Sequence, residues 1–147
     1  MSTSNTIGYL LQHLSTALAR QSEEILQEKL GLGFSQFKIL MALQWNPTTQ
    51  QRQIADSLGQ TEASVSRQIK IMHDKDLLKT EVSQGNRREH ITTPTRKGAE
   101  LTEKALVTLN NYHAPMFELL TGEQKQQLLE TLQIMHEFAC QPSKSGA

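Results

Sequence analysis

The sequence lacks the features that mark a disulfide-rich, zinc-binding or membrane-spanning protein. Its 147 residues include one cysteine, Cys140, which excludes an internal disulfide framework and a zinc site built from several cysteines. No apolar run reaches the length of a membrane span, and the opening residues MSTSNTIGYLL lack the basic start and apolar core of a signal peptide. The sequence therefore predicts a cytoplasmic protein without a membrane partner.

An excess of one charge is also missing, although the charges are unevenly placed. The chain holds 15 Lys and Arg against 15 Asp and Glu. Residues 61–98 carry eight basic and five acidic side chains, whereas residues 99–147 carry three and six. Because salt screens charges beyond roughly 10 Å, a local basic surplus can attract phosphates despite distant acidic groups. The asymmetry permits nucleic-acid binding, and it is equally consistent with ordinary surface variation.

Residue patterns of catalysis and of metal or cofactor binding are absent as well. The sequence shows no nucleophile-base signature, no Gly-rich phosphate loop and no catalytic carboxylate motif. The five histidines are dispersed, with no pair at i,i+4 spacing: His13, His73, His90, His113 and His136. We therefore predict no enzymatic activity, no bound metal and no cofactor.

The most informative segment present is residues 51–70, QRQIADSLGQTEASVSRQIK. Gly59 supplies a residue for a left-handed helix end, and Thr61 can cap a second helix. Apolar residues at helical spacing give each helix one inward face: Ile54, Ala55 and Leu58 on the first, Val65, Ile69 and Met72 on the second. The pattern predicts a helix-turn-helix, which commonly places its second helix in the DNA major groove.

A β-hairpin is expected to follow that second helix. Asp76 is the candidate for a left-handed turn position. Residues 77–82 and 89–93 are β-capable, and the loop between them, SQGNRR, contains the Gly85-Asn86 turn signal. A short hairpin with arginines at its tip, placed after a recognition helix, is a wing.

Long amphipathic helices are expected on both sides of this module. We predict helices over residues 6–30, over SQFKILMAL with Ser35 as its cap, and from residues 93–95 to about Leu120, with a kink or break near Pro115. Thr48 with Gln51, and TGEQ at residues 121–124, resemble capping boxes that open two further helices. The exposed apolar faces of the terminal helices would be buried most simply against a second copy, as a two-fold dimer.

Taken together, the pattern predicts a mainly α protein with a small β-hairpin wing, in which N- and C-terminal dimerisation helices flank a winged helix-turn-helix core. Residues 1–147 form one domain in this interpretation. Residues 35–98 make the DNA-binding lobe, residues 6–30 and 99–140 make the dimerisation helices, and residues 141–147 make a frayed tail.

In element order and in two motifs, the sequence resembles the MarR (multiple antibiotic resistance regulator) family of winged-helix transcription factors. The motifs are residues 51–72 and NRREHITTPTRKG, residues 86–98. Members of the family usually have Asp-x-Arg in the wing and Leu-Thr-x-x-Gly at the next helix start. Here Asn86 replaces the Asp and Pro94 replaces the Leu. Gln60 and Gln68 also stand where helix-turn-helix sequences generally carry apolar side chains.

The resemblance implies a homodimer that binds a pseudo-palindrome of double-stranded DNA and represses transcription until a small-molecule effector releases it. The alternative is a winged-helix protein–protein adaptor that lacks sequence-specific DNA binding. Such an adaptor would have a recognition face richer in exposed apolar groups.

The candidate DNA-binding residues lie on the recognition helix and in the wing. An arginine there can hold a guanine edge through two hydrogen bonds, and wing arginines can enter a narrow minor groove. Thr61 can cap its helix and also meet a phosphate, and the other side chains offer hydroxyl, amide or cationic groups. The candidates are Thr61, Ser64, Ser66, Arg67, Lys70, Asn86, Arg87 and Arg88.

A cleft for a small aromatic or amphipathic ligand is a further expectation, since relatives bind aromatic acids between the DNA-binding lobe and the dimerisation helices. The six candidate lining residues are Tyr9, His13, Phe37, Met41, Trp45 and Tyr112. Most such residues serve only as core packing. Cys140 has no predicted role.

Overall fold

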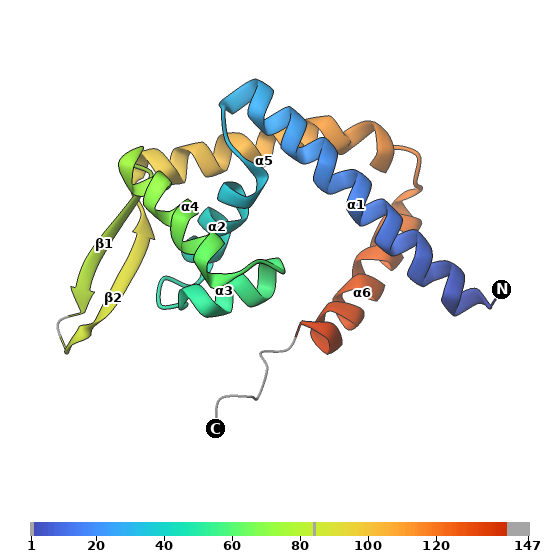
Figure 1. The fold of residues 1–147 in the computed structure, drawn as a ribbon. Coiled ribbons are helices and arrows are strands. Elements are labelled where there is room, and N and C mark those ends of the chain that lie inside the picture. The colour runs from blue at the N-terminus through green and yellow to red at the C-terminus, as the bar shows by residue number, and fades with distance from the viewer. Residues whose placement is uncertain (1, 84, 141–147) are drawn as a thin grey trace. The chain divides into compact units, whose positions relative to one another are not determined.

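The computed structural model describes residues 2–83 and 85–140 (Figure 1). Backbone contacts divide the chain into two compact units, Met1–Leu109 and Asn110–Ala147. The elements run in the predicted order: α1 (Thr3–Leu30), α2 (Phe34–Trp45), α3 (Gln51–Leu58), α4 (Glu62–Asp74), β1 (Leu78–Ser83), β2 (Asn86–Pro94), α5 (Arg96–Phe117) and α6 (Gly122–Ala139). The fold is therefore mainly α with one antiparallel hairpin, as predicted.

The hydrophobic core of the first unit lies where α2, α3 and α4 meet the end of α1 and the start of the hairpin. Figure 1 shows the base of the hairpin next to the C-terminal end of α4. Aliphatic side chains dominate this core, and its fully buried members include Leu26, Ile39, Leu40, Leu43, Val65 and Met72. These six residues come from α1, α2 and α4, and Ile54 of α3 belongs to the same core, so its burial fixes α3 and α4 against α2.

Three helices begin at other residues than predicted. Helix α1 starts at Thr3 because the Ser2 hydroxyl accepts a hydrogen bond from the Asn5 N–H at 3.2 Å. Helix α2 is capped by Gly33 rather than Ser35, which lies in the first turn and whose hydroxyl accepts a hydrogen bond from Gln60 in the turn between α3 and α4. The predicted capping box of Thr48 and Gln51 is also wrong.

The N-cap of α3 is Gln50, and the Gln53 side chain accepts a hydrogen bond from the Gln50 N–H at 3.1 Å. The Thr48 hydroxyl instead donates to the Asn46 carboxamide oxygen at 2.8 Å. The Thr48 hydroxyl therefore bonds Asn46 and does not cap α3. The spacing of a capping box is met twice in this polar stretch, and only the three-dimensional path of the chain selects one of the two.

Four other local predictions are confirmed. Gly59 is left-handed with φ 64°, and Asp76 is left-handed with φ 59°. The Thr61 hydroxyl caps α4 by accepting from the Ser64 N–H. At the start of α6, Thr121 and Gln124 form the reciprocal capping box, with distances of 2.9 and 3.1 Å.

The hairpin is longer than the sequence suggested. Antiparallel pairing continues to Ser83 and Asn86, with a register shift between Val82 and Ser83. Asn86, Arg87 and Arg88 therefore belong to the backbone of β2, and the prediction that placed them in the loop is wrong. A connection of two residues remains, which suits an antiparallel hairpin and lets the ladder extend into the expected loop.

The second unit contains the end of α5 and all of α6. Pro115 lies inside α5, which ends two residues later at Phe117, so the predicted break occurs close to the proline. Helix α6 has no buried residue. The predicted frayed tail, residues 141–147, lies outside the described residues. None of the described helices is long and apolar enough to span a membrane.

Candidate nucleic-acid interface

The turn between α3 and α4 brings the two helices together after only three residues. Gly59 ends α3 in the left-handed conformation, and the Gln60 N–H returns to the Ala55 carbonyl at 3.0 Å. Thr61 then caps α4, its hydroxyl 3.1 Å from the Ser64 nitrogen. This compact turn is the central part of a helix-turn-helix.

Helix α4 has one buried face and one exposed face. Val65, Ile69 and Met72 are buried against the core, at steps of four and three residues. The exposed face carries small, polar and charged side chains together with one large apolar residue: Glu62, Ala63, Ser66, Arg67, Lys70, Ile71 and Asp74. A solvent-facing row of this composition can meet base edges and phosphates.

The predicted recognition residues fall unevenly on this helix. Ser66, Arg67 and Lys70 lie on the exposed face, as the helical periodicity indicated. Ser64 is half-buried, and the Thr61 hydroxyl already accepts the capping hydrogen bond. The described residues form two ion pairs, Lys79–Glu81 and Arg96–Glu100. Neither pair includes Arg67 or Lys70.

Sequence reasoning missed Ala63 on this face. Ala63 is exposed and lies three and four residues before Ser66 and Arg67, so its methyl group joins the same row. An alanine methyl is one of the apolar groups that can contact the thymine methyl in the major groove. The same spacing rule that selected Arg67 could have found it, but a search for polar groups passed over it.

The hairpin is fastened to the C-terminal end of α4. The Leu77 N–H donates to the Met72 carbonyl at 2.8 Å, across the left-handed Asp76. The His73 Nε2 lies 2.8 Å from the Thr80 hydroxyl on β1, and that hydroxyl lies 3.0 Å from the hydroxyl of Thr92 on β2. The recognition helix therefore holds both strands of the wing at their base.

The motif Pro94-Thr-Arg-Lys-Gly98 joins the hairpin to α5 through the same corner. The Thr95 hydroxyl donates to the Asp76 carbonyl at 2.7 Å and accepts from the Gly98 N–H at 3.0 Å. A Cβ atom on Gly98 would collide with the Leu77 carbonyl oxygen. Thr95 is thus needed because it caps α5 and also bonds the turn at Asp76. Gly98 is needed because the backbone of Leu77 lies too close for a side chain.

The wing residues Asn86, Arg87 and Arg88 are described only by their backbone. They begin β2, next to the register shift at the end of the hairpin. Their side chains lie outside the described part of the structure, so their contact with DNA stays a prediction.

The predicted effector residues are spread over different environments. On α1, Tyr9 and His13 are exposed, with ring centroids 5.6 Å apart. Phe37 is buried in the core and Met41 is half-buried, whereas Trp45 is 82% exposed. Tyr112 belongs to the second unit. The predicted cleft that would unite these six residues stays a prediction.

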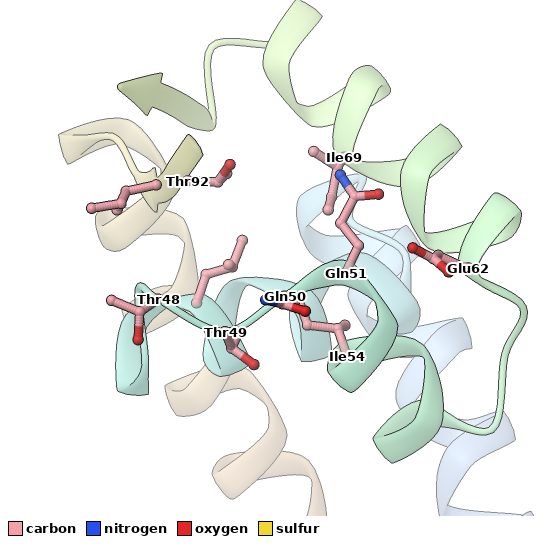
Figure 2. Close-up of a pocket in the computed structure, with 10 residues that line it drawn as sticks. Thr48, Thr49, Gln50, Gln51, Ile54, Glu62, Ile69 and Thr92 are labelled. Atoms are coloured by element: carbon pink, nitrogen blue, oxygen red, sulfur yellow. The ribbon is translucent and has the colours of Figure 1, made fainter. Parts of the chain in front are cut away.

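A pocket of about 370 Å³ lies in the winged-helix lobe between α3, α4 and β2 (Figure 2). Threonine and glutamine side chains and four aliphatic ones share its lining, in which Glu62 is the charged residue. The lining residues are Leu43, Thr48, Thr49, Gln50, Gln51, Ile54, Glu62, Ile69, Ile91 and Thr92. None of the six predicted effector residues is among them. In residues 2–83 and 85–140, no three His, Cys, Asp or Glu side chains gather in a possible metal site.

A helix-turn-helix followed directly by a hairpin on the same core defines a winged-helix protein. Residues 30–89 match the model of the MarR family. A MarR family protein of Mycobacterium tuberculosis, solved with salicylic acid, is 22% identical with a TM-score of 0.76, covering 87% of this chain and 94% of that one. No curated protein matches the chain.

Two further solved structures share the fold. A MarR/EmrR family transcriptional regulator from Acinetobacter sp. ADP1 is 22% identical with a TM-score of 0.76, covering 97% of this chain and all of that one. The transcriptional repressor CouR, bound to a 23-mer DNA duplex, is 25% identical with a TM-score of 0.73, covering 90% and 93%. Residues 30–89 of this chain thus resemble the MarR family, and the chain has the fold of MarR transcriptional regulators.

Proposed function

We propose that this protein is a sequence-specific DNA-binding regulator of transcription, acting as a homodimeric repressor. The observation that carries the proposal is the exposed face of α4, where Ser66, Arg67 and Lys70 lie opposite the buried Val65, Ile69 and Met72. Arg67 can hold a guanine through two hydrogen bonds, and Ala63 can meet a thymine methyl. CouR, with the same fold, was solved on a DNA duplex.

The dimer is proposed from apolar side chains that one chain leaves exposed. The first half of α1 exposes Ile7, Tyr9, Leu10 and Leu14. Helix α6 exposes six large apolar residues: Leu128, Leu129, Leu132, Ile134, Met135 and Phe138. Exposed apolar surface of this extent is rare on monomers, and a second copy covering it would give an isologous two-fold interface.

A two-fold dimer would place its two recognition helices in successive major grooves of a pseudo-palindromic operator. The half-sites would lie roughly 10 bp apart, one turn of DNA. The wing residues Asn86, Arg87 and Arg88 would reach the adjacent backbone or minor groove. A small aromatic or amphipathic effector would release the DNA, as salicylic acid bound to the M. tuberculosis relative suggests.

Selection from a random DNA pool tests the proposal most directly. The purified protein should enrich a short inverted repeat and bind it in the nanomolar range, with an affinity that falls steeply as salt rises. If no sequence is enriched from the pool at low salt, the proposed sequence-specific DNA binding is wrong. Stoichiometric capture of one protein, unchanged by nuclease, would instead support the adaptor function.

Two sets of variants then separate base reading from backbone contact. Arg67→Ala should reduce the preference for the selected operator over a mutated site by about 10- to 100-fold. Arg87→Ala with Arg88→Ala should weaken binding to all sequences alike and, because a dimer loses four cations, lower the slope of log K against log salt by about four. Lys104→Ala, an exposed cation of α5, is the control that should change neither quantity.

A further inference from the structure

Two glutamines of the helix-turn-helix make hydrogen bonds to the start of α2. The Gln60 amide nitrogen donates to the Ser35 hydroxyl at 2.7 Å, and the Gln36 amide nitrogen donates to the Gln68 amide oxygen at 3.1 Å. The partners are 25 and 32 residues apart in the sequence, and all four side chains are half-buried. These are the two positions of the motif where an apolar residue is usual.

The start of α2 is itself firmly held. The Gln36 amide oxygen accepts from the Gly33 N–H at 3.3 Å, so both ends of this amide are in use. The Glu23 carboxylate on α1 accepts from the Phe34 N–H at 2.6 Å. A carboxylate at a helix N-terminus is favourable because the first N–H groups point toward it. Gln36 therefore presents its amide N–H to α4 in a fixed direction.

Stability alone does not explain these amides. A neutral hydrogen bond contributes little net stability, and replacing both of its partners by apolar groups of similar shape can be neutral or favourable. The Gln60 Oε1 is buried and has no hydrogen-bond partner among the described residues, which is unfavourable. What a hydrogen bond adds over an apolar contact is direction, because apolar surfaces can slide past each other.

Direction matters here because the two bonded positions lie along α4 and its cap. Gln60 precedes the cap Thr61, and Gln68 follows Arg67 directly, half-buried where Arg67 is exposed. Holding Gln60 and Gln68 against α2 resists rotation of α4 about its own axis. Rotations of roughly 10–20° are enough to spoil the geometry of a binding group such as the Arg67 guanidinium.

We propose that Gln36 and Gln68, with the neighbouring pair Ser35 and Gln60, are positioning residues that set the rotation of the recognition helix on α2. Their contribution is to the discrimination between DNA sequences rather than to stability. This inference rests on the proposed DNA-binding function.

The test compares Gln36→Met, Gln68→Met and the double variant with the wild-type protein. Methionine keeps the unbranched shape and removes the amide. Two quantities are measured, the unfolding midpoint and the ratio of affinities for the selected operator and for a site mutated at the base pair that Arg67→Ala identifies. We expect a ratio lowered about tenfold in all three variants, and a midpoint close to the wild-type value in the double variant, where neither amide is left without its partner. The affinity ratio should fall no further in the double variant than in either single variant, because each single substitution already removes the same hydrogen bond.

Gln44→Met is the matched control, since Gln44 is an exposed glutamine of the same helix α2 and should alter neither quantity. Ser35→Ala tests the second pair and should lower the ratio independently. Unchanged ratios in all these variants would overturn the inference while leaving DNA reading intact. If the ratio of the double variant falls only together with its unfolding midpoint, the two glutamines have only a structural role. If the wild-type protein shows no preference among DNA sequences, the proposed function itself is wrong.

Discussion

Helices α4 and α6 carry the same apolar spacing and have opposite environments. Val65, Ile69 and Met72 recur at steps of four and three residues along α4, and Leu128, Leu132 and Met135 repeat those steps along α6. The three residues of α4 are 0 to 6% exposed, whereas the three of α6 are each 40% exposed. Equal periodicity thus predicts an apolar face in both helices, and only a packing partner makes that face a core.

The difference shows which part of the molecule is complete within one chain. The winged-helix lobe covers α4 from several helices and holds its middle and its C-terminal end by hydrogen bonds through Gln68 and His73. Helix α6 has a good N-terminal capping box and no buried side chain. Isolated helices of this length are marginally stable in water. Because α6 buries no side chain within its own chain, we expect it to be stabilised by packing against a partner.

The largest expected effect comes from charging the apolar face of α6. Leu128→Glu with Leu132→Glu would bury two carboxylates in the proposed dimer interface, so the dimer should dissociate. Losing the second half-site removes the gain of bivalent binding, and operator affinity should fall about 100- to 10,000-fold. Sedimentation and DNA titration measure the two losses. Gln126→Glu with Gln133→Glu adds the same charge at polar positions of α6 and should leave the dimer intact; equal behaviour of both pairs would place the interface elsewhere.

Methionine truncation compares the two helices position by position. Met72→Ala should lower the free energy of unfolding of the lobe by about 2–5 kcal/mol, because it leaves a cavity in a closed core. Met135→Ala should leave the lobe unchanged and shift the melting temperature only in a manner that depends on protein concentration. Denaturant unfolding at two protein concentrations distinguishes them. A large, concentration-independent loss for Met135→Ala would show that α6 is buried within its own chain.

Glycine substitution provides a similar contrast. Gly98→Ala should destabilise the protein by about 1–3 kcal/mol, because the new methyl group collides with the Leu77 carbonyl at the corner of the wing and α5. Gly122→Ala, at the first residue of α6, meets no atom within 4 Å and should be close to neutral. Thermal unfolding of the two variants checks this expectation, and a neutral Gly98→Ala would contradict the tight contact.

The smallest effect is expected where the two helices end. Asp76 follows α4 with φ 59°, so Asp76→Gly should stabilise the lobe by up to about 1 kcal/mol. Cys140 caps α6 with φ −108°, which needs no glycine, and Cys140→Gly should give no gain. Chemical denaturation resolves the difference. Asp76→Val should be destabilising, and a gain from valine would refute the conformational explanation.

Much of the fold was predictable because local chemistry determined it. Gly59, Asp76 and the pair Thr121 and Gln124 occupy the turn and cap positions that their backbone preferences indicated. Helix order and the apolar faces followed from periodicity. The cap at Ser35 failed because its hydroxyl has a partner 25 residues away, which no local pattern reveals.

The candidate site was predictable to a similar degree. Ser66, Arg67 and Lys70 lie on the exposed face because a helix with Val65, Ile69 and Met72 inside must turn them outward. Ala63 was missed because it has no polar group. Long-range hydrogen bonds of Gln60 and Gln68 could not be inferred, since their partners on α2 are brought near only by folding.

The sequence by itself determined the winged-helix order, the turns and the outward face of the recognition helix, because caps, glycine positions and helical periodicity act over a few residues. The tertiary structure decided how α4 is held on α2, how the wing is fixed through His73, Thr80 and Thr92, and why Gly98 tolerates no side chain. These outcomes depend on distances between segments far apart in the chain, and such distances exist only after the hydrophobic core has formed.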